Sequence, residues 1–365
     1  MSAPSLLLAG GGTAGHTSPL IATADELSTQ RPDVRLTALG TARGLETTAI
    51  PAAGLALELI PPVPMPRQLS LDLALVGPRL LRAVQATVQV LRRVGAQAVL
   101  GFGGYVSTPA YLAARRLGLP IVVHEQNTMP GLANKLAARL TRAVYTSFPT
   151  TPLPHATCIG LPMRRGITEL DRAGVREQAR SVFDLPAATP VLLVSGGSQG
   201  AASINRAALG ARERLLARGI SMLHVLGPKN LTDETMRTVD SSSGAVYAPV
   251  GYVEQMEQAY AVADLMLGRS GANTVMETAA VGLPAVFVPY PHGNGEQALN
   301  AELVVDVGGG LLLADANCTS DWVANEIPAL LEDHIRLQGM IEALAGVART
   351  DAAAVLAART LEVIG

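Results

Sequence analysis

The sequence predicts an α/β protein made of two parallel-sheet domains. Short apolar segments without polar alternation recur at the spacing of βα units, and the series starts again halfway along the chain. Strands of this kind are buried on both faces, which requires helices on both sides of a parallel sheet. At 365 residues the chain is long enough for two such domains, each with its own core.

The first series of predicted strands occupies roughly the first 160 residues. Its members are SLLLAG, VRLTALG, AVLGFGG, IVVHEQ, RAVYTSF and ATCIG. Helices are predicted between them over SPLIATADELSTQ and STPAYLAARRLG. Ser18 is the expected N-cap of the first helix, with Pro19 in its first turn.

The second series repeats the pattern. Its members are VLLVSGG, SMLHVLG, AVYAPVGY, LMLGRSG, PAVFVPY and GGGLLL. Proline-rich FPTTPLPH and the turn GLPMRRG place the hinge around residues 160–166. We therefore expect an N-terminal domain over residues 1–163 and a C-terminal domain over residues 164–344. A last helix at about residues 345–365 is expected to pack back on the first domain.

Composition narrows the class of partner. Residues 1–164 carry 14 arginines and lysines against 7 acidic residues, hence +7, whereas the remainder carries 14 against 23, hence −9. A basic half indicates a face turned toward an anionic partner, but no basic run with interleaved aromatics points to nucleic acid. The two cysteines form neither a disulfide framework nor a metal-binding spacing. No signal peptide or spanning segment is recognisable, so we expect a soluble, cytoplasmic chain.

A glycine-rich turn follows the first predicted strand of each domain. The two segments read LLLAGGGTAGHTSP and VLLVSGGSQGAASIN. Ligands of open parallel sheets bind beyond the carboxyl ends of the strands, and glycines let a phosphate approach the N–H groups of the following helix. For a single glycine-rich turn, a purely structural tight turn is the alternative. Two such turns in matched halves of the chain make that alternative weaker.

The turns argue against a P-loop and against an NAD site. Neither ends in the Gly-Lys-Ser/Thr of a P-loop. An NAD site needs an acid at the end of the second strand, where this chain has Gly40, Thr41 and Ala42; the following Arg43 leaves an NADP site open. His16 in the first turn is unusual for a dinucleotide site but suits proton transfer.

Five segments resemble the MurG family of glycosyltransferases, in the family's order and over nearly the whole chain. They are GGGTAGH, GFGGYVSTP, VVHEQNTMPGLANK, VSGGSQGAASIN and GRSGANTVMETAAVGLPAVFVPYPHGNGEQALNA. The resemblance implies a GT-B fold, in which two Rossmann-like parallel-sheet domains face each other across a cleft. It also implies peptidoglycan synthesis, by inverting transfer of GlcNAc from UDP-GlcNAc to the C4 hydroxyl of undecaprenyl-diphospho-MurNAc-pentapeptide. No cofactor is implied.

The resemblance assigns roles to individual residues. Glu277 matches the carboxylate that holds the ribose, Ser198 the donor-phosphate contact, and Arg164 and Val253 the surroundings of the uracil. The other implied donor-binding residues are Thr13, Ala14, Gly15, Asn127, Ala272, Asn273, Thr274, Val275, Met276 and Gln297. The implied acceptor and diphosphate side comprises Gly103, Gly104, Tyr105 and Asn134.

The chain departs from the family's commonest motifs at two positions. Ala14 stands in place of a glycine, and Leu161 stands in place of an asparagine. Alanine would be strained at position 14 if the turn required a positive φ there.

The chemistry requires a base for the attacking hydroxyl, and His16 and Glu125 are the candidates. A histidine has a pKa near neutrality without help, whereas Glu125 needs burial to raise its own. We favour His16 and keep Glu125 open. Helix N-termini at Ser198 and Ala272, with Arg269, can stabilise the leaving UDP, and no Asp-x-Asp phrase indicates a metal.

A segment over residues 63–93 combines leucines and valines with five arginines. Its implied membrane face comprises Arg67, Leu75, Arg79, Leu80 and Arg82. An amphipathic helix packed on the sheet is the alternative. Because each arginine near an anionic leaflet contributes about 1 kcal/mol, the set would give reversible docking to the cytoplasmic face of the cell membrane. The expected partners are UDP-GlcNAc, the lipid-linked acceptor and the anionic inner leaflet, with cell-wall synthesis proteins in addition.

Two other functions fit the same donor site. A UDP-GlcNAc 2-epimerase of GT-B shape would act on the donor alone, and a catalytically silent protein would bind the nucleotide sugar at the membrane without turnover.

Overall fold

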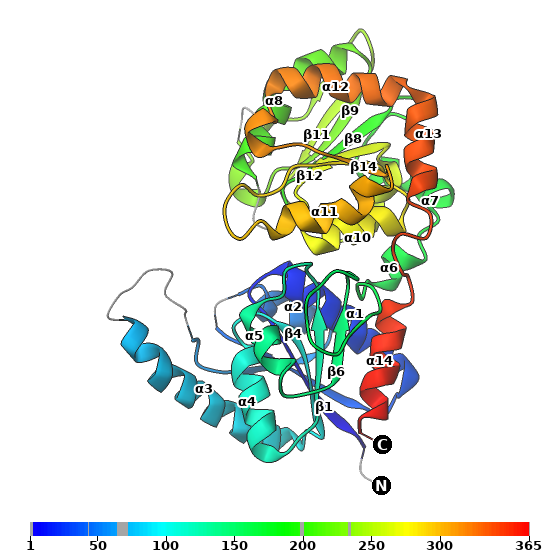
Figure 1. The fold of residues 1–365 in the computed structure, drawn as a ribbon. Coiled ribbons are helices and arrows are strands. Elements are labelled where there is room, and N and C mark those ends of the chain that lie inside the picture. Colours follow the sequence, from blue (N-terminus) through cyan, green and yellow to red (C-terminus); the bar gives the residue numbers. More distant parts are fainter. Residues whose placement is uncertain (1–2, 43, 64–71, 198–200, 233–234, 365) are drawn as a thin grey trace. The chain divides into compact units, whose positions relative to one another are not determined.

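The structure, a computed structural model, describes residues 3–42, 44–63, 72–197, 201–232 and 235–364. It consists of two compact units (Figure 1). Unit 1 comprises Met1–Arg164 and Arg349–Gly365, and unit 2 comprises Arg165–Ala348.

Unit 1 is built on a parallel sheet that, over the described residues, has seven strands in the order β3-β2-β1-β4-β5-β6-β7. The strands are β1 (Ser5–Gly10), β2 (Arg35–Gly40), β3 (Ala56–Leu59), β4 (Ala98–Gly103), β5 (Ile121–Glu125), β6 (Ala143–Thr146) and β7 (Ala156–Cys158). The direction of winding reverses at β1, which pairs with β2 on one side and β4 on the other. Such a switch point is where open α/β sheets bind ligands.

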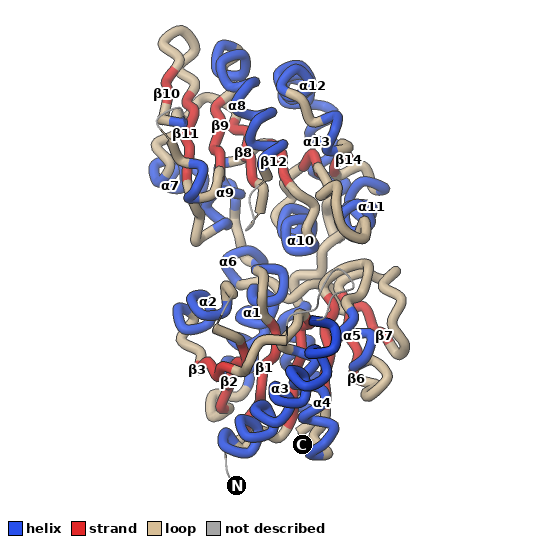
Figure 2. The backbone as a smooth tube through the Cα atoms, turned by 90° about the vertical axis from the view of Figure 1, so that its left-hand side faces the viewer, coloured by secondary structure: helices blue, strands red, loops and turns tan. Residues whose placement is uncertain are grey.

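Helices cover both faces of this sheet (Figure 2). They are α1 (Ala14–Gln30), α2 (Glu46–Ala52), α3 (Asp72–Val94), α4 (Ser107–Leu117), α5 (Leu132–Ala137) and α14 (Ala352–Glu362). Successive residues of β1 enter opposite cores: Leu7 packs in the cluster that includes α3 and α4, and Leu8 in the one that includes α1 and α14. The C-terminal helix α14 therefore belongs to unit 1, where it lies beside α1 (Figure 1).

Unit 2 repeats the design with the order β10-β11-β9-β8-β12-β13-β14 over the described residues. Its strands are β8 (Val191–Ser195), β9 (Ser221–Val225), β10 (Thr238–Val239), β11 (Val246–Val250), β12 (Leu265–Gly268), β13 (Ala285–Phe287) and β14 (Gly310–Leu312). Its helices are α6 (Arg165–Thr168), α7 (Arg172–Val182), α8 (Ala202–Ala217), α9 (Met256–Val262), α10 (Ala272–Ala280), α11 (Glu296–Asp306), α12 (Ser320–Glu332) and α13 (His334–Ala343), with short 3₁₀ turns η1 (Pro228–Asn230) and η3 (Asp315–Asn317).

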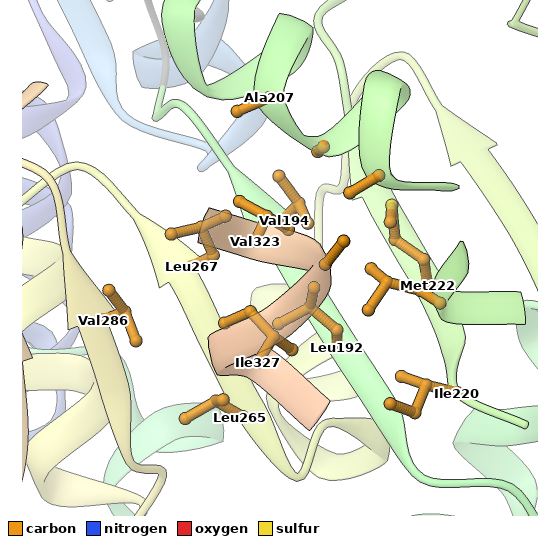
Figure 3. Packing of buried hydrophobic residues seen from close by; sticks show 14 of the residues in the cluster. Leu192, Val194, Ala207, Ile220, Met222, Leu265, Leu267, Val286, Val323 and Ile327 are labelled. Atoms are coloured by element: carbon orange, nitrogen blue, oxygen red, sulfur yellow. The ribbon is translucent and has the colours of Figure 1, made fainter. Parts of the chain in front are cut away.

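The core of unit 2 is made of aliphatic side chains. Figure 3 shows Leu192 and Val194 of β8 and Leu267 of β12 in one cluster with Val323 and Ile327 of α12. All described pairings in the two sheets are parallel except β10 with β11, which is antiparallel. The two doubly wound sheets confirm the predicted fold class.

The structure corrects two details of the sequence prediction. Edge strands β3 and β10 were not expected; both are exposed or half-buried, so they lack the apolar runs by which buried strands are recognised. The expectation that Ser18 caps the first helix was wrong, because α1 begins at Ala14 and its N-cap is Thr13. Pro19 consequently lies inside α1.

Candidate active site

The loop between β1 and α1 forms the first glycine turn. Gly12 has a φ of +96°, a conformation that favours glycine. Thr13 follows in an extended conformation as the N-cap of α1. The predicted site residues Ala14 and Gly15 therefore lie in the first turn of α1, where Ala14 is helical and unstrained.

The loop after β4 packs closely against this turn. Gly103 and Gly104 have φ values of +86° and +77°. A Cβ on Gly104 would lie 2.5 Å from the carbonyl oxygen of Gly11, and a Cβ on Gly12 would lie 2.9 Å from the ring of Tyr105. Backbone therefore approaches backbone at the switch point, as glycine alone permits.

His16 lies where these two loops meet. A Cβ on Gly103 would stand 3.5 Å from His16 Nε2 and 3.1 Å from Asn134 Nδ2, so both side chains border Gly103. His16 Nδ1 is 3.2 Å from the hydroxyl of Thr13. Burial lowers the pKa of His16 to about 4, and the charge of Glu46 acts in the opposite direction. The pKa of His16 therefore lies below the near-neutral value on which the sequence analysis favoured this residue, and at neutral pH the imidazole is neutral and able to accept a proton.

Glu125 ends β5 and is buried. Its Oε1 accepts a hydrogen bond from the backbone N–H of Asn127 (3.0 Å), and its Oε2 accepts from Gly131 N–H (3.0 Å) and Asn134 Nδ2 (2.9 Å). Burial raises the pKa of Glu125, and these hydrogen bonds oppose the rise. Both oxygens are thus engaged in holding the loop 126–131 and Asn134.

His124 precedes Glu125 and is fully buried. Its Nε2 contacts the carbonyl oxygen of Gly160 at 3.0 Å, and its Nδ1 lies 3.1 Å from Gln126 Nε2. Both ring nitrogens have partners within the fold, which is the arrangement of a structural histidine.

The sequence analysis does not single out Glu46, which the structure brings to the first turn. Its buried carboxylate accepts hydrogen bonds from the backbone N–H groups of Gly12 (2.9 Å) and Thr41 (3.2 Å). Glu46 lies three residues beyond positions 40–43, where an acid for a dinucleotide ribose would be expected. Arg43, the residue that kept an NADP site open, lies outside the described residues.

In unit 2, α10 starts directly after β12 with Gly271 as its N-cap. Ala272, Val275 and Met276 are buried, while Asn273 and Thr274 are partly exposed. Glu277 lies in the second turn of this helix and accepts a hydrogen bond from the hydroxyl of Tyr260 (2.8 Å). Unpaired N–H groups at such a helix start favour an anion.

Arg269 lies on the loop before α10 and is held within unit 2. Its guanidinium donates to the carbonyl oxygens of Val288 and Pro289 and to the hydroxyl of Ser203, and it forms an ion pair with Asp315. These contacts fasten the loops after β12 and β13 to α8 and η3. The structure thus gives Arg269 a tethering role besides any contact with a leaving group.

The remaining predicted donor-binding residues belong to separate elements of the two units. Gln297 is partly exposed at the start of α11, where its Oε1 accepts from the N–H of Tyr290 (2.9 Å). Val253 is buried between β11 and α9 of unit 2, whereas Asn127 and Arg164 belong to unit 1. Ser198 lies outside the described residues.

The predicted membrane face lies partly on α3. Arg82 is exposed, Arg79 is partly exposed, and Leu80 packs against the core of unit 1. Leu81, which was not in the predicted set, is 63% exposed. Arg67 and the side chain of Leu75 lie outside what the structure describes.

Over the described residues, no helix has the length and apolar character that crossing a bilayer requires. Within the same residues, no three His, Cys, Asp or Glu side chains are grouped to bind a metal ion.

Comparison with known proteins places both units in one enzyme family. Residues 6–146 match the N-terminal domain of glycosyltransferase family 28, and residues 191–356 match its C-terminal domain. A Nocardioides protein named UDP-N-acetylglucosamine--N-acetylmuramyl-(pentapeptide) pyrophosphoryl-undecaprenol N-acetylglucosamine transferase is 53% identical, over 98% of this chain and 97% of its own length. The protein of the same name from Cutibacterium acnes is 51% identical, over 98% of this chain and 96% of its own length.

Solved structures agree. The crystal structure of Acinetobacter baumannii MurG superposes with a TM-score of 0.73 at 25% identity, over 98% of this chain and 99% of that one. A UDP-GlcNAc 2-epimerase from Neisseria meningitidis shares the fold, with a TM-score of 0.68 at 14% identity, over 98% of this chain and 100% of that one. The fold is GT-B, and the chain belongs to the MurG family within glycosyltransferase family 28.

Proposed function

We propose that this chain transfers GlcNAc from UDP-GlcNAc to the C4 hydroxyl of undecaprenyl-diphospho-MurNAc-pentapeptide, with inversion at the anomeric carbon. The observation that carries the proposal is identity of 53% over almost the full length of a relative named for this transfer. The match extends over both units, so it includes the predicted donor-binding and acceptor-binding residues alike.

We propose His16 as the base. It is neutral at neutral pH because burial lowers its pKa, and it stands at the switch point of unit 1. With Nδ1–H donating to Thr13 Oγ1, the lone pair of Nε2 is the proton acceptor. Glu125 is less suitable, because N–H groups of Asn127, Gly131 and Asn134 already donate to both of its oxygens. Glu125 then acts by holding Asn134 next to His16 and Gly103.

In the proposed step, the acceptor oxygen bonds to the anomeric carbon while the bond from that carbon to the UDP oxygen breaks. The acceptor proton passes to His16 Nε2, and the electron pair leaves with UDP. The amides at the start of α10, with Ser198, stabilise the growing charge of the diphosphate. Proton transfer to a positioned base contributes about 10²–10⁴-fold in rate.

We assign the donor contacts as the family motifs imply. Glu277 holds the two ribose hydroxyls, since one carboxylate can accept from both members of a cis-diol. Gln297 and Asn127 contact the GlcNAc hydroxyls, and Arg164 and Val253 the uracil. Thr13, Ala14 and Gly15 adjoin the reacting centre, as do Gly103, Gly104, Tyr105 and Asn134 on the acceptor side.

We further propose that unit 1 docks reversibly on the cytoplasmic face of the cell membrane through α3. Its support is the net charge of +7 over residues 1–164, together with the exposure of Leu81 and Arg82. Such an arrangement gives peripheral, salt-sensitive binding.

The deciding experiment follows radiolabel from UDP-GlcNAc into a short-chain lipid-linked muramyl acceptor. Label in the lipid product, dependent on acceptor, supports the transferase. Formation of the manno epimer from UDP-GlcNAc alone would instead identify an epimerase. Binding of UDP-GlcNAc with neither product would leave a nucleotide-sugar-binding protein.

A further inference from the structure

A buried carboxylate hydrogen-bonded to the first glycine turn has no part in the mechanism described so far. Glu46, the first residue of α2, has an exposed fraction of 0%. Burial of a charged group is costly unless hydrogen bonds satisfy it. A carboxylate enclosed at a switch point therefore needs an explanation.

The carboxylate of Glu46 joins three loops at the same edge of the sheet. Oε2 accepts from the N–H of Gly12, which follows β1. Oε1 accepts from the N–H (3.2 Å) and hydroxyl (3.3 Å) of Thr41, which follows β2. The hydroxyl of Tyr105, which follows β4, lies 3.5 Å from Oε1.

Glycines make the space that this side chain fills. A Cβ on Gly44 would lie 2.1 Å from Glu46 Oε2, and one on Gly40 would lie 2.7 Å from Glu46 Cγ. A Cβ on Gly11 would lie 3.0 Å from the carboxyl carbon. Three loops thus provide the donors, and the glycines after β1 and around the end of β2 provide the room for one carboxylate.

The hydrogen bond between Gly12 and Glu46 distinguishes the first glycine turn from an ordinary phosphate-binding turn. In a nucleotide-binding turn, amides of this kind face a phosphate. Here the N–H of Gly12 faces an anion that the chain itself supplies. The N–H of Gly12 is therefore already hydrogen-bonded within the fold, and the carboxylate of Glu46 holds the first glycine turn in place.

We propose that Glu46 is a positioning residue for the transfer reaction: it fixes the first glycine turn so that His16 meets the acceptor hydroxyl, and its negative charge stabilises the imidazolium that forms. The inference rests on the proposed function. The pKa of His16 is consistent with it, because burial lowers that pKa and the charge of Glu46 partly restores it. Glu46 acts through His16 and need not touch the substrate.

The test is a double-mutant cycle on kcat with Glu46→Gln and His16→Ala. Gln keeps the shape but replaces one acceptor oxygen with an NH₂ group, which cannot accept from Gly12 or Thr41. We expect Glu46→Gln to lower kcat about 10- to 100-fold, the factor that corresponds to the loss of one hydrogen bond to a charged group. In the His16→Ala background the same change should have no further effect.

Two controls separate this role from a general loss of structure. Glu58→Gln makes the same substitution elsewhere in unit 1, on a side chain paired with Arg93, and should leave kcat unchanged. The affinity for UDP alone, measured by calorimetry, should be the same in Glu46→Gln as in wild type. If Glu46→Gln does not fold, Glu46→Asp enters the cycle instead; it keeps the charge, and we expect a smaller loss.

An unchanged kcat in the Glu46 variant would overturn the inference, and so would an equal loss in both His16 backgrounds, which marks a purely structural role. If wild type transfers GlcNAc but His16→Ala is equally active, the assignment of the base fails and the role of Glu46 fails with it. If the wild-type protein transferred no GlcNAc to the lipid acceptor, the proposed function itself would be contradicted.

Discussion

The hydroxyl of Tyr260 donates a 2.8 Å hydrogen bond to Glu277 Oε2 within unit 2. Tyr260 is buried on α9, and Glu277 is partly exposed on α10. A rigid phenol thus sets the direction of the carboxylate that we assign to the ribose. Hydrogen bonds to charged groups contribute about 1.5–3 kcal/mol, so the orientation is well defined.

We expect Tyr260→Phe to raise the KM for UDP-GlcNAc by up to about tenfold and to leave kcat nearly unchanged, because the carboxylate would lose its fixed direction. The preference for the ribose donor over its 2′-deoxy analogue should fall as well. Tyr247→Phe is the matched control, since that buried hydroxyl contacts His224 instead. Equal KM values in wild type and Tyr260→Phe would contradict the prediction.

His16→Ala should lower kcat by about 10²–10⁴-fold, because the acceptor hydroxyl would lose its base. Glu125→Gln keeps the shape of the side chain and should cost less, through the position of Asn134. Steady-state kinetics with the lipid acceptor distinguish the two variants, with UDP affinity as the folding control. A larger loss in Glu125→Gln would reverse the assignment.

His224 predicts a pH-dependent stability of unit 2. Burial lowers its pKa to about 3, so between pH 6.5 and that value the unfolded chain binds a proton that the folded chain does not. Stability is therefore retained above pH 6.5 and lost as the pH falls, by about 1.4 kcal/mol per pH unit for one such histidine.

Trp322, the single tryptophan of the chain, packs against the core of unit 2 and reports its unfolding by fluorescence. In denaturant titrations between pH 6.5 and 4.5, His224→Gln should show a shallower dependence on pH than wild type. His334→Gln, on an exposed side chain, should behave as wild type. An identical slope in all three proteins would show that His224 is not responsible.

Charge reversal on α3 should weaken docking on membranes. Arg79→Glu with Arg82→Glu is expected to reduce binding to anionic vesicles by about 2 kcal/mol or more, roughly 30-fold. Arg115→Glu with Arg116→Glu changes two exposed arginines on α4 of the same unit and serves as the control. Sedimentation with vesicles at several salt concentrations measures both. Equal losses would indicate a general charge effect and not a docking face.

Gly104→Ala should abolish most activity, since the new Cβ would lie 2.5 Å from the carbonyl oxygen of Gly11 and the residue has a φ of +77°. Gly118→Ala introduces alanine at a comparable φ of +69° with nothing within 4 Å, so it should cost only about 1 kcal/mol in stability. Thermal unfolding and kcat separate a local clash from backbone strain. Full activity in Gly104→Ala would show that the two loops can move apart.

The parallel strands were predictable because their signal is local. The fully buried residues of β1, β4 and β8 form continuous apolar runs, and each run stops at a turn residue that is visible in the sequence. Strands β3 and β10 were not predicted because they lie at sheet edges, where their side chains are exposed to solvent or only half-buried and form no apolar run. The start of α1 was misplaced for a related reason: Pro19 suits a first helical turn, but the glycine turn ends earlier, at Thr13.

By itself, the sequence determined the two doubly wound sheets, the family and the motifs that carry the candidate site, because apolar period and glycine placement act over a few residues. Only the tertiary structure decided which side chains serve those motifs. Glu46 is separated from Gly12 by 34 positions and meets it because parallel winding brings the ends of β1 and β2 to one edge. Likewise, Tyr260 orients Glu277 from a neighbouring helix, and Arg269 is fastened to Asp315, which lies 46 positions further along the chain. Such pairings depend on burial and direction in space, which neighbouring residues in a sequence do not record.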